Sequence, residues 1–355
     1  MSEKVTLLLF SMVWVILCLI LKYSKTRNRK KWYYFSAVVL CVIFGFRRID
    51  TIYGGSDTLI YISQFLNVKA EFFLSRSEIL FRVYMYALRL ITDNSRVFIV
   101  FNTAITTSAL LYFIYNYYEK DDNYSTLYLI WPIFIYYTCN AIRNGIAISS
   151  CLLSVVALKE KKNKRAVLFA ILGFLFHYSA VFYLGYLVFY YLYDWLRSKR
   201  VPNIMIISGA IAILMSIVPI MNRFFYSSRY TFLAEKNNGS FLGMAPYYMI
   251  GVLAVIFRHK LVTRERHKEC LYGTYYLCLL IPVVALYGIY RAPYFFVGIL
   301  AVTAADIIHL VSQRYIAKSS RPVLSIIASL VFFMYGVLKL WTVGEQSGIL
   351  LYRLF

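Results

Sequence analysis

Apolar runs that are long enough, or nearly long enough, to cross a lipid bilayer follow one another along almost the whole chain. One crossing of the hydrocarbon core takes about 20 apolar residues. The runs are Val5–Leu21, Tyr33–Phe46, Val97–Asn116, Thr126–Asn140, Ile146–Leu158, Ala166–Tyr193, Asn203–Met221, Pro246–Phe257, Leu271–Ile289, Pro293–Val311 and Val323–Trp341. Only 15% of the 355 residues are charged, against about 25% in soluble domains. The pattern predicts an all-α, polytopic integral membrane protein, a single membrane domain over residues 1–355 with about twelve crossings, some of them short or re-entrant.

Lys and Arg concentrate in a few loops, and this bias predicts which side of the membrane each loop faces. Basic residues near segment ends mark the cytoplasmic side. In the twelve-crossing topology all the basic loops fall on that side, and they are Lys22–Lys31, Lys159–Arg165, Arg197–Arg200, Arg258–Lys268 and Arg314–Arg321. The bias also explains most of the formal charge of +22, so nucleic acid is not an expected partner. Both termini and two large loops, residues 47–96 and 222–245, are then expected outside the cytoplasm.

The apolar run Ala166–Tyr193 is interrupted at its centre by Phe176-His177-Tyr178-Ser179-Ala180. Basic loops bracket the run on both sides, so the chain between them has to leave the cytoplasmic side and return. The run is too short for two full crossings. It predicts two short helices that meet near the outer surface, with His177 and Ser179 at the join.

The segment Ile79–Ile91 is not assigned as a crossing, because a crossing here would invert the side of every later loop. Its sequence places Arg82 and Arg89 seven residues apart on one helical face, with Glu78 one turn before Arg82. This pattern predicts an amphipathic helix at the interface or along a cavity, within the outer loop of residues 47–96.

Ionisable residues gather in the outer half of the predicted topology. Such residues at the membrane edge are costly and indicate function. They are Arg47, Arg48, Asp57, Glu78, Arg82, Arg143, His177, Arg229 and Arg291. Several cations with two carboxylates and one imidazole suit an anionic ligand and the transfer of a proton.

Most of these candidates also have an ordinary structural explanation. Arg143 can be an arginine that snorkels at a helix end. Asp57 can be a helix N-cap, and Glu78 with Arg82 can be a surface ion pair. His177 can be a hydrogen-bonded histidine without a further role. Arg229, and Arg291 beside Tyr290 and Tyr294, can anchor the chain at the membrane interface.

The position of Arg143 favours a functional explanation over a structural one. It opens a predicted helix at Asn140-Ala141-Ile142-Arg143. A guanidinium at a helix N-terminus is disfavoured by the helix dipole unless an anion lies there. The position therefore favours phosphate binding. Tyr61 shares a helical face with Asp57, which places both toward the same cavity.

The sequence does not predict a metal site or disulfides. The six cysteines are scattered in or beside apolar segments, and acidic pairs that would hold a divalent ion are lacking on the outer side. Asp121-Asp122 is such a pair, but the topology places it in the cytoplasm. A metal-dependent transferase is disfavoured.

Several of these motifs, taken in order, resemble the EpsG family of bacterial exopolysaccharide proteins, which are Wzy-type polymerases. The motifs are GSDTLIY at Gly55–Tyr61, Glu78 with Phe81, Arg143 at a helix start, the basic loop Lys159–Arg165, and FHYSA at Phe176–Ala180. The resemblance covers roughly residues 47 to 193. Asn144 follows Arg143 where the family usually has Gln, which leaves the role of that amide open.

The resemblance implies a GT-C-like glycosyltransferase in the bacterial cytoplasmic (inner) membrane that needs no cofactor. It would polymerise oligosaccharide repeat units, as for exopolysaccharide, O-antigen or capsule, carried on undecaprenyl diphosphate. The implied partners are the lipid-linked donor and acceptor glycans, membrane lipids, a chain-length regulator and a flippase. The catalytic candidates are Asp57, Glu78, Arg143 and His177. The candidates for substrate binding are Arg47, Arg48, Tyr61, Arg82, Ser179, Arg229, Tyr290 and Arg291.

Two other classes fit the sequence less well. A flippase for the same lipid-linked units would also use about twelve helices, but transporters commonly show paired repeats and ionisable sites at the midplane. A membrane O-acyltransferase would need polar chemistry that reaches a cytoplasmic acyl donor. Which of Asp57, Glu78 and His177 acts as the base is left open at this point.

Overall fold

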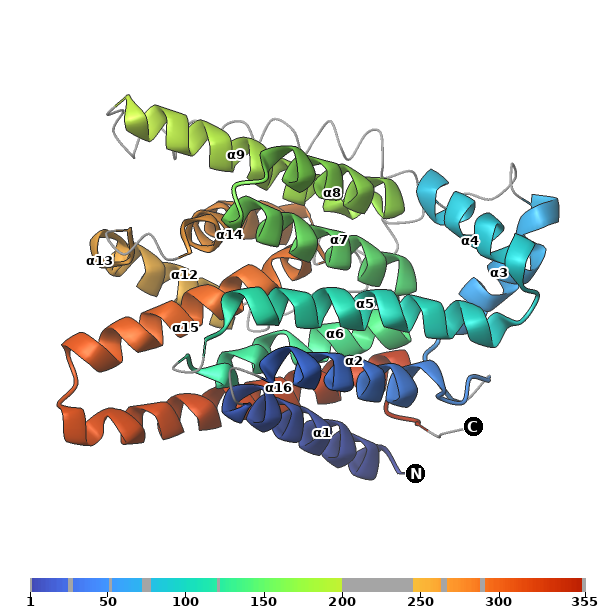
Figure 1. Ribbon diagram of the computed structural model, residues 1–355, viewed down its shortest axis with the longest axis horizontal. Helices are drawn as coiled ribbons and strands as arrows, with labels where there is room; N and C mark the ends of the chain where they lie inside the picture. Colours follow the sequence, from blue (N-terminus) through green and yellow to red (C-terminus); the bar gives the residue numbers. More distant parts are fainter. Residues whose placement is uncertain are drawn as a thin grey trace. The chain divides into compact units, whose positions relative to one another are not determined.

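The computed structural model of the protein describes residues 2–24, 28–50, 53–71, 78–119, 122–199, 245–262, 267–287 and 291–352, and all the regular structure within these ranges is helical (Figure 1). The contacts divide the chain into two compact units, Met1–Ala180 with Val311–Phe355, and Val181–Leu310. The predicted helical class is therefore confirmed. The single membrane domain stays a prediction.

The first unit is built from long helices joined by short turns. Its elements are α1 (Glu3–Tyr23), α2 (Arg29–Gly45), α3 (Thr58–Glu71), α4 (Ile79–Ile91), α5 (Ser95–Tyr117), η2 (Tyr124–Leu129), α6 (Trp131–Cys139), α7 (Ile142–Lys159), α8 (Asn163–Phe176), η3 (Tyr178–Ala180), η6 (Lys318–Ser320) and α16 (Arg321–Ser347). The second unit contains α9 (Val181–Ser198), α12 (Ala245–Ile256), α13 (Arg258–Val262), α14 (Lys268–Tyr287), η5 (Ala292–Phe296) and α15 (Val297–Arg314) up to Leu310.

The helices follow the predicted apolar runs closely, but fewer helices than the predicted twelve crossings are long enough to span the membrane. Within the described residues, five helical segments are long and apolar enough to span a membrane: Glu3–Tyr23, Ser95–Tyr117, Ile142–Lys159, Ala292–Arg314 and Lys318–Glu345. The membrane class is supported, whereas the number of about twelve crossings stays a prediction. The predicted crossing Asn203–Met221 and the predicted second outer loop, apart from Ala245, lie outside the described residues.

The predicted interruption at His177 is confirmed. Helix α8 ends at Phe176, and His177 follows with an extended backbone at φ −157° and ψ 119°. One short turn, η3, then leads to Val181, where α9 begins. Because the chain leaves the helix at this residue, the imidazole stands at a helix end.

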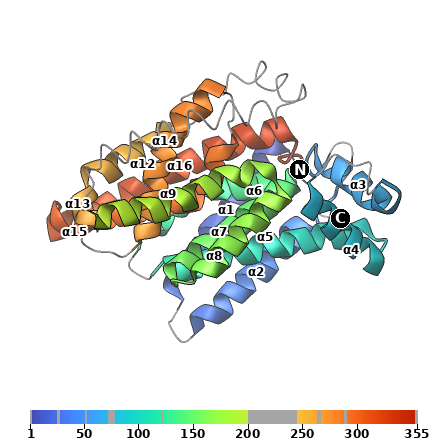
Figure 2. The ribbon, with the colours of Figure 1, turned by 90° about the horizontal axis from the view of Figure 1, so that it is seen from above.

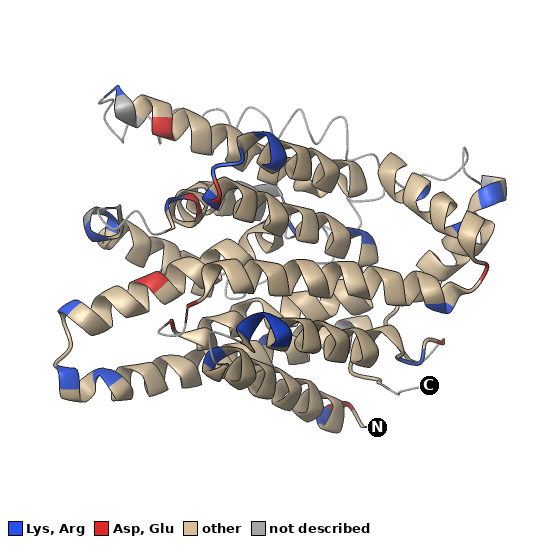
Figure 3. Ribbon diagram, in the orientation of Figure 1, with Lys and Arg blue, Asp and Glu red and all other residues tan. Residues whose placement is uncertain are grey.

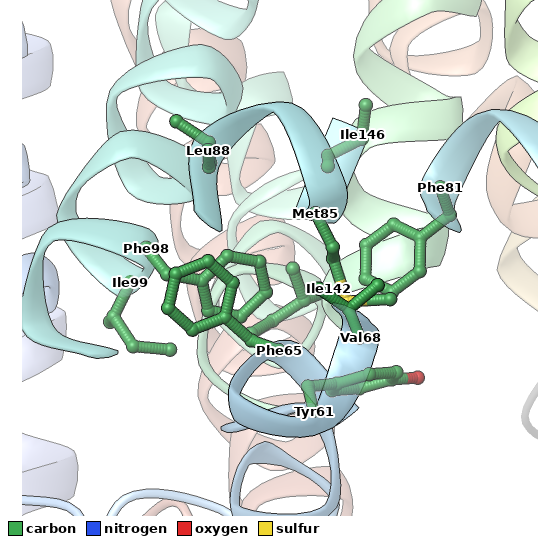
Figure 4. Close-up of a cluster of buried hydrophobic side chains, with 10 residues drawn as sticks. All are labelled: Tyr61, Phe65, Val68, Phe81, Met85, Leu88, Phe98, Ile99, Ile142 and Ile146. Carbon is green, nitrogen blue, oxygen red and sulfur yellow. The ribbon is translucent and has the colours of Figure 1, made fainter. Parts of the chain in front are cut away.

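The predicted amphipathic helix is confirmed with the predicted bounds as α4. Its buried residues, Phe81, Met85 and Leu88, recur at the spacing of one helical face. They pack with side chains of α3, α5 and α7 in one apolar cluster (Figure 4): Tyr61, Phe65, Val68, Phe81, Met85, Leu88, Phe98, Ile99, Ile142 and Ile146. Figures 1 and 2 both show α3 and α4 together beyond the N-terminal end of α5. This cluster fixes two short helices against the starts of two long ones.

Helices α7 and α8 pack closely because small residues line their contact. Ala166 and Ala170 of α8 are fully buried. A Cβ added at Gly173 would lie 3.2 Å from the Ala147 carbonyl oxygen and 3.3 Å from Cys151 Sγ. Ser154 Oγ donates a hydrogen bond of 2.7 Å to the Ala166 carbonyl oxygen. Small residues let helix backbones approach in this way in membrane proteins.

Two of the basic segments meet at the C-terminal end of α5. Arg29, at the start of α2, donates to the carbonyl oxygen of Tyr118, and Lys159, at the end of α7, donates to that of Asn116. Cations at this end of a helix are favoured by its dipole. Figure 3 shows the charged residues of these helices near the helix ends, with uncharged middles. These two basic segments therefore lie at the same end of α5, as the prediction that they share one side of the membrane requires.

Candidate active site

One carboxylate, that of Glu78, joins side chains from two other helices. Its Oε1 atom lies 2.6 Å from Nδ1 of His177, and its Oε2 atom forms an ion pair with the guanidinium of Arg143. Each residue stands at a helix end: Glu78 is the N-cap of α4, Arg143 is in the first turn of α7, and His177 is the C-cap of α8. Three elements that are distant in sequence thus place a carboxylate, a guanidinium and an imidazole together.

The three side chains differ in how much of each is exposed to solvent. The side chains of Glu78 and His177 are 6% and 7% exposed, whereas that of Arg143 is 24% exposed. Burial by itself raises the pKa of Glu78, but the hydrogen bond and charge of His177 and the charge of Arg143 outweigh it and lower that pKa to about 2. The carboxylate is therefore charged at neutral pH and holds a proton weakly.

Two aromatic rings flank the Arg143 guanidinium. The Arg143 Cζ atom lies 5.5 Å from the ring centre of Tyr61 and 6.0 Å from that of Phe81. Arg143 Nε also donates to Tyr61 Oη at 3.4 Å. Cation–π contacts of this kind hold a guanidinium without neutralising it. Tyr61, a predicted substrate-binding residue, therefore positions Arg143.

The turn that carries Asp57 is fixed to the break between α6 and α7. Gly55 has φ +100°, and a Cβ there would overlap the Cys139 carbonyl oxygen. Thr58 Oγ1 donates to the same oxygen at 2.6 Å. The Asp57 backbone N–H donates to Asn140 Oδ1 at 2.7 Å. These contacts hold the half-buried Asp57 beside the start of the helix that carries Arg143.

Asn140 is a structural part of this site that the sequence reasoning missed. Its side chain is 2% exposed, and its Oδ1 also lies 3.4 Å from Ser56 Oγ. The available signal was an amide residue at the end of an apolar run, three positions before Arg143.

Arg47 and Arg48, both predicted to bind substrate, have different surroundings. Arg47 is 1% exposed, and its guanidinium donates to the carbonyl oxygens of Gly54 at 3.3 Å, Cys139 at 3.1 Å and Phe44. These contacts favour a structural role for Arg47 in holding the turn. Arg48 is 41% exposed and pairs with Asp50 at 2.7 Å.

The remaining predicted residues are distributed more widely. Arg82 is half-buried on α4, one turn after Glu78, and Ser179 is half-buried in η3, two residues after His177. Arg291 is exposed at the start of η5 in the second unit. Arg229 and Tyr290 lie outside the described residues. Across the described ranges, no group of three His, Cys, Asp or Glu side chains lies together as a metal site requires.

Comparison of the sequence with known protein families finds a match to one family model. The sequence model of the EpsG family matches residues 30–354, which is wider than the motifs between residues 47 and 193 and includes Glu78, Arg143 and His177. No curated protein and no solved structure matches the chain significantly.

Proposed function

The chain belongs to the EpsG family, and from this premise we propose that it polymerises lipid-linked oligosaccharide repeat units as a Wzy-type glycosyltransferase. The donor is a growing glycan on a polyprenyl diphosphate, and the acceptor is a new lipid-linked unit. The family match and the apolar helices support a membrane-bound polymerase of polysaccharide. The proposed substrate is what the resemblance to the family implies, and the proposed mechanism is supported by the geometry around Glu78.

The observation that carries the proposal is the carboxylate shared between Arg143 and His177. The acceptor hydroxyl loses its proton to a base, and its oxygen bonds to the anomeric carbon of the donor. The bond between that carbon and the diphosphate oxygen breaks, and the electron pair leaves with the diphosphate. Arg143, the most exposed of the three side chains, stabilises this negative charge by charge-assisted hydrogen bonds.

His177 is the base that the geometry supports best among Asp57, Glu78 and His177. A general base works best with a pKa near the working pH, and the pKa of Glu78 is about 2. Glu78 instead accepts a hydrogen bond from His177 Nδ1, which orients the imidazole and stabilises its protonated form, as the carboxylate does in a catalytic triad. Asp57 is kept in the proposal as a ligand for sugar hydroxyls near Arg143.

The proposed reaction takes place at the outer face of the cytoplasmic membrane. Along α7, Arg143 and Lys159 are separated by about 24 Å at 1.5 Å per residue, and Lys159 meets Arg29 at the basic end. If the basic end faces the cytoplasm, the cluster of Glu78, Arg143 and His177 faces outward. The twelve crossings, the GT-C-like architecture and the outward termini belong to this proposal.

The test is a reaction with purified protein, lipid-linked repeat units and no added metal. We expect the wild type to give a ladder of glycan lengths, and Arg143→Ala and His177→Ala to leave single units. His267→Ala is the matched control, because His267 is also buried and pairs with a carboxylate, Asp306, at 2.9 Å. A ladder of normal length in both site variants would refute the proposal.

The same substrates distinguish the two alternative functions. A flippase defect would trap lipid-linked units on the cytoplasmic leaflet, which labelling from one side of the membrane detects. An O-acyltransferase would add acyl groups without lengthening the glycan, which mass spectrometry of the product detects.

A further inference from the structure

The two carboxylate oxygens of Glu78 contact two different side chains, so a change at one of these side chains affects the other. The imidazole of His177 contacts Oε1, and the guanidinium of Arg143 contacts Oε2. We infer that binding of a diphosphate at Arg143 strengthens His177 as a base, because the anion draws the guanidinium away from the carboxylate that both side chains share. The inference rests on the proposed function and specifies how the same site is regulated by its substrate.

The three side chains differ in solvent exposure, and this difference determines which of them a diphosphate contacts first. An anion that arrives from solvent meets Arg143, whereas Glu78 and His177 are almost fully covered. Diphosphate oxygens compete with the carboxylate for the N–H groups of a guanidinium, since both form charge-assisted bonds. Before this exchange, the rings of Tyr61 and Phe81 flank the Arg143 guanidinium.

The charges around His177 determine the direction of the effect. Glu78, the N-cap of α4, contacts both His177 and Arg143 of α7, and Tyr61 of α3 contacts Arg143. Arg82 follows Glu78 by one turn on α4, and Asp57 lies in the turn before α3. The last turns of α8, Ala170–Phe176, carry apolar side chains and glycine only. With a neutral imidazole, Glu78 and Arg143 balance each other. A bound diphosphate adds negative charge and leaves Glu78 less compensated, and both changes favour the imidazolium.

The coupling also returns His177 to its neutral form after each round of the proposed reaction. His177 takes the acceptor proton while the diphosphate is present, and the imidazolium then pairs with Glu78. When the lipid diphosphate leaves, Arg143 returns to Glu78 and the imidazole releases its proton to solvent. By linkage, a proton on His177 must strengthen diphosphate binding by the same factor.

The experiment uses the full-length protein in lipid nanodiscs with labelled histidine, of which the chain has four. Imidazole resonances are followed by NMR through a pH titration, with and without inorganic pyrophosphate, and His177→Asn assigns the site resonance. We expect pyrophosphate to move the midpoint of the His177 titration upward by about one pH unit, a tenfold coupling. The His267 resonance is the internal control and is expected to stay unchanged, because its carboxylate partner Asp306 has no arginine partner among the described residues.

Glu78→Gln tests the route of the coupling. The amide keeps the size of the side chain but removes the charge, and we expect the upward movement to fall to less than half. An equal movement in this variant would show that the anion acts on His177 directly and would overturn the inference. So would pyrophosphate binding without movement in the wild type, or no binding at all. The glycan ladder is scored separately, so a ladder without the coupling refutes the inference and leaves the proposed polymerase intact.

Discussion

Glu78 and His177 are 99 residues apart in the sequence, yet Oε1 of Glu78 lies 2.6 Å from Nδ1 of His177. The first residue caps the start of α4 and the second caps the end of α8. Because both side chains are buried, neither is free to turn toward another partner at low cost. This pair fixes the orientation of the imidazole on which the proposed chemistry depends.

Removing the charge of Glu78 is expected to slow polymerisation. Glu78→Gln leaves the imidazole without its charged partner and should lower the turnover rate by about 100-fold, within the range of general base catalysis. The measurement is the initial rate of ladder formation. Asp306→Asn is the matched control, since it neutralises the carboxylate of the other buried His–carboxylate pair. Equal rates for Glu78→Gln and the wild type would contradict the assigned role.

The lowered pKa of Glu78 predicts how stability depends on pH. The native carboxyl has a pKa of about 2, below its ordinary value of 4.5, so the stabilisation is present above pH 4.5 and is lost as the pH falls toward 2. We expect the wild type to exceed Glu78→Gln in thermal stability at pH 6, and the difference to shrink below pH 4.5. A difference that stays constant down to pH 3 would rule this out.

Two adjacent arginines should respond differently to substitution. Arg47→Met removes hydrogen bonds to three backbone carbonyl oxygens, of which that of Cys139 still accepts from Thr58 Oγ1. Each buried oxygen left without a donor costs about 1–3 kcal/mol. Arg48→Met removes a solvent-exposed pair with Asp50 and a cation–π contact with Tyr53, each worth about 1 kcal/mol or less. The check is the melting temperature of each variant in detergent. Similar melting temperatures would show that Arg47 does not hold the turn.

Two glycines with positive φ provide another matched comparison. Gly55 has φ +100° and no space for a Cβ, whereas Gly348 has φ +69° and nothing within 4 Å of the added atom. Gly348→Ala is expected to cost about 1 kcal/mol for the backbone conformation alone. Gly55→Ala should cost clearly more and should also reduce polymerisation, because the turn moves away from Cys139. Equal losses in the two variants would argue against the fixed turn.

Cysteine labelling in intact cells tests the orientation of the site. In a background without the six native cysteines, we expect Ser56→Cys and Ser179→Cys to react with an impermeant maleimide from outside. Lys162→Cys and Lys164→Cys, in the basic turn before and at the start of α8, should react only after permeabilisation. Labelling of residues 56 and 179 from opposite sides would remove the proposed active site.

The helices could be predicted from sequence because apolar runs and charged loops mark their ends directly. The segment Ile79–Ile91 has the same bounds as α4, and the break at His177 lies where polar residues interrupt an apolar run. The number of crossings does not follow from the apolar runs alone, since helices such as α2 and α8 are shorter than the thickness of the hydrocarbon core.

The partners within the site could not be read from the sequence in the same way. Glu78 is followed by Arg82 at the spacing of a local ion pair, but the structure pairs it with Arg143 and His177. Arg47 was grouped with the substrate-binding cations, because composition gives no information about which guanidinium is turned toward backbone carbonyls. Contacts of this kind depend on tertiary packing, which brings helix ends together from distant parts of the chain.

The hydrogen bonds to Cys139 and Asn140 attach the Gly55–Thr58 turn to the segment just before α7, so that the turn and the start of α7 have to move together. A displacement of the turn would break these hydrogen bonds to the start of the helix that carries Arg143. In the proposed reaction, the sugar chain would therefore have to reach Arg143 without displacing this turn.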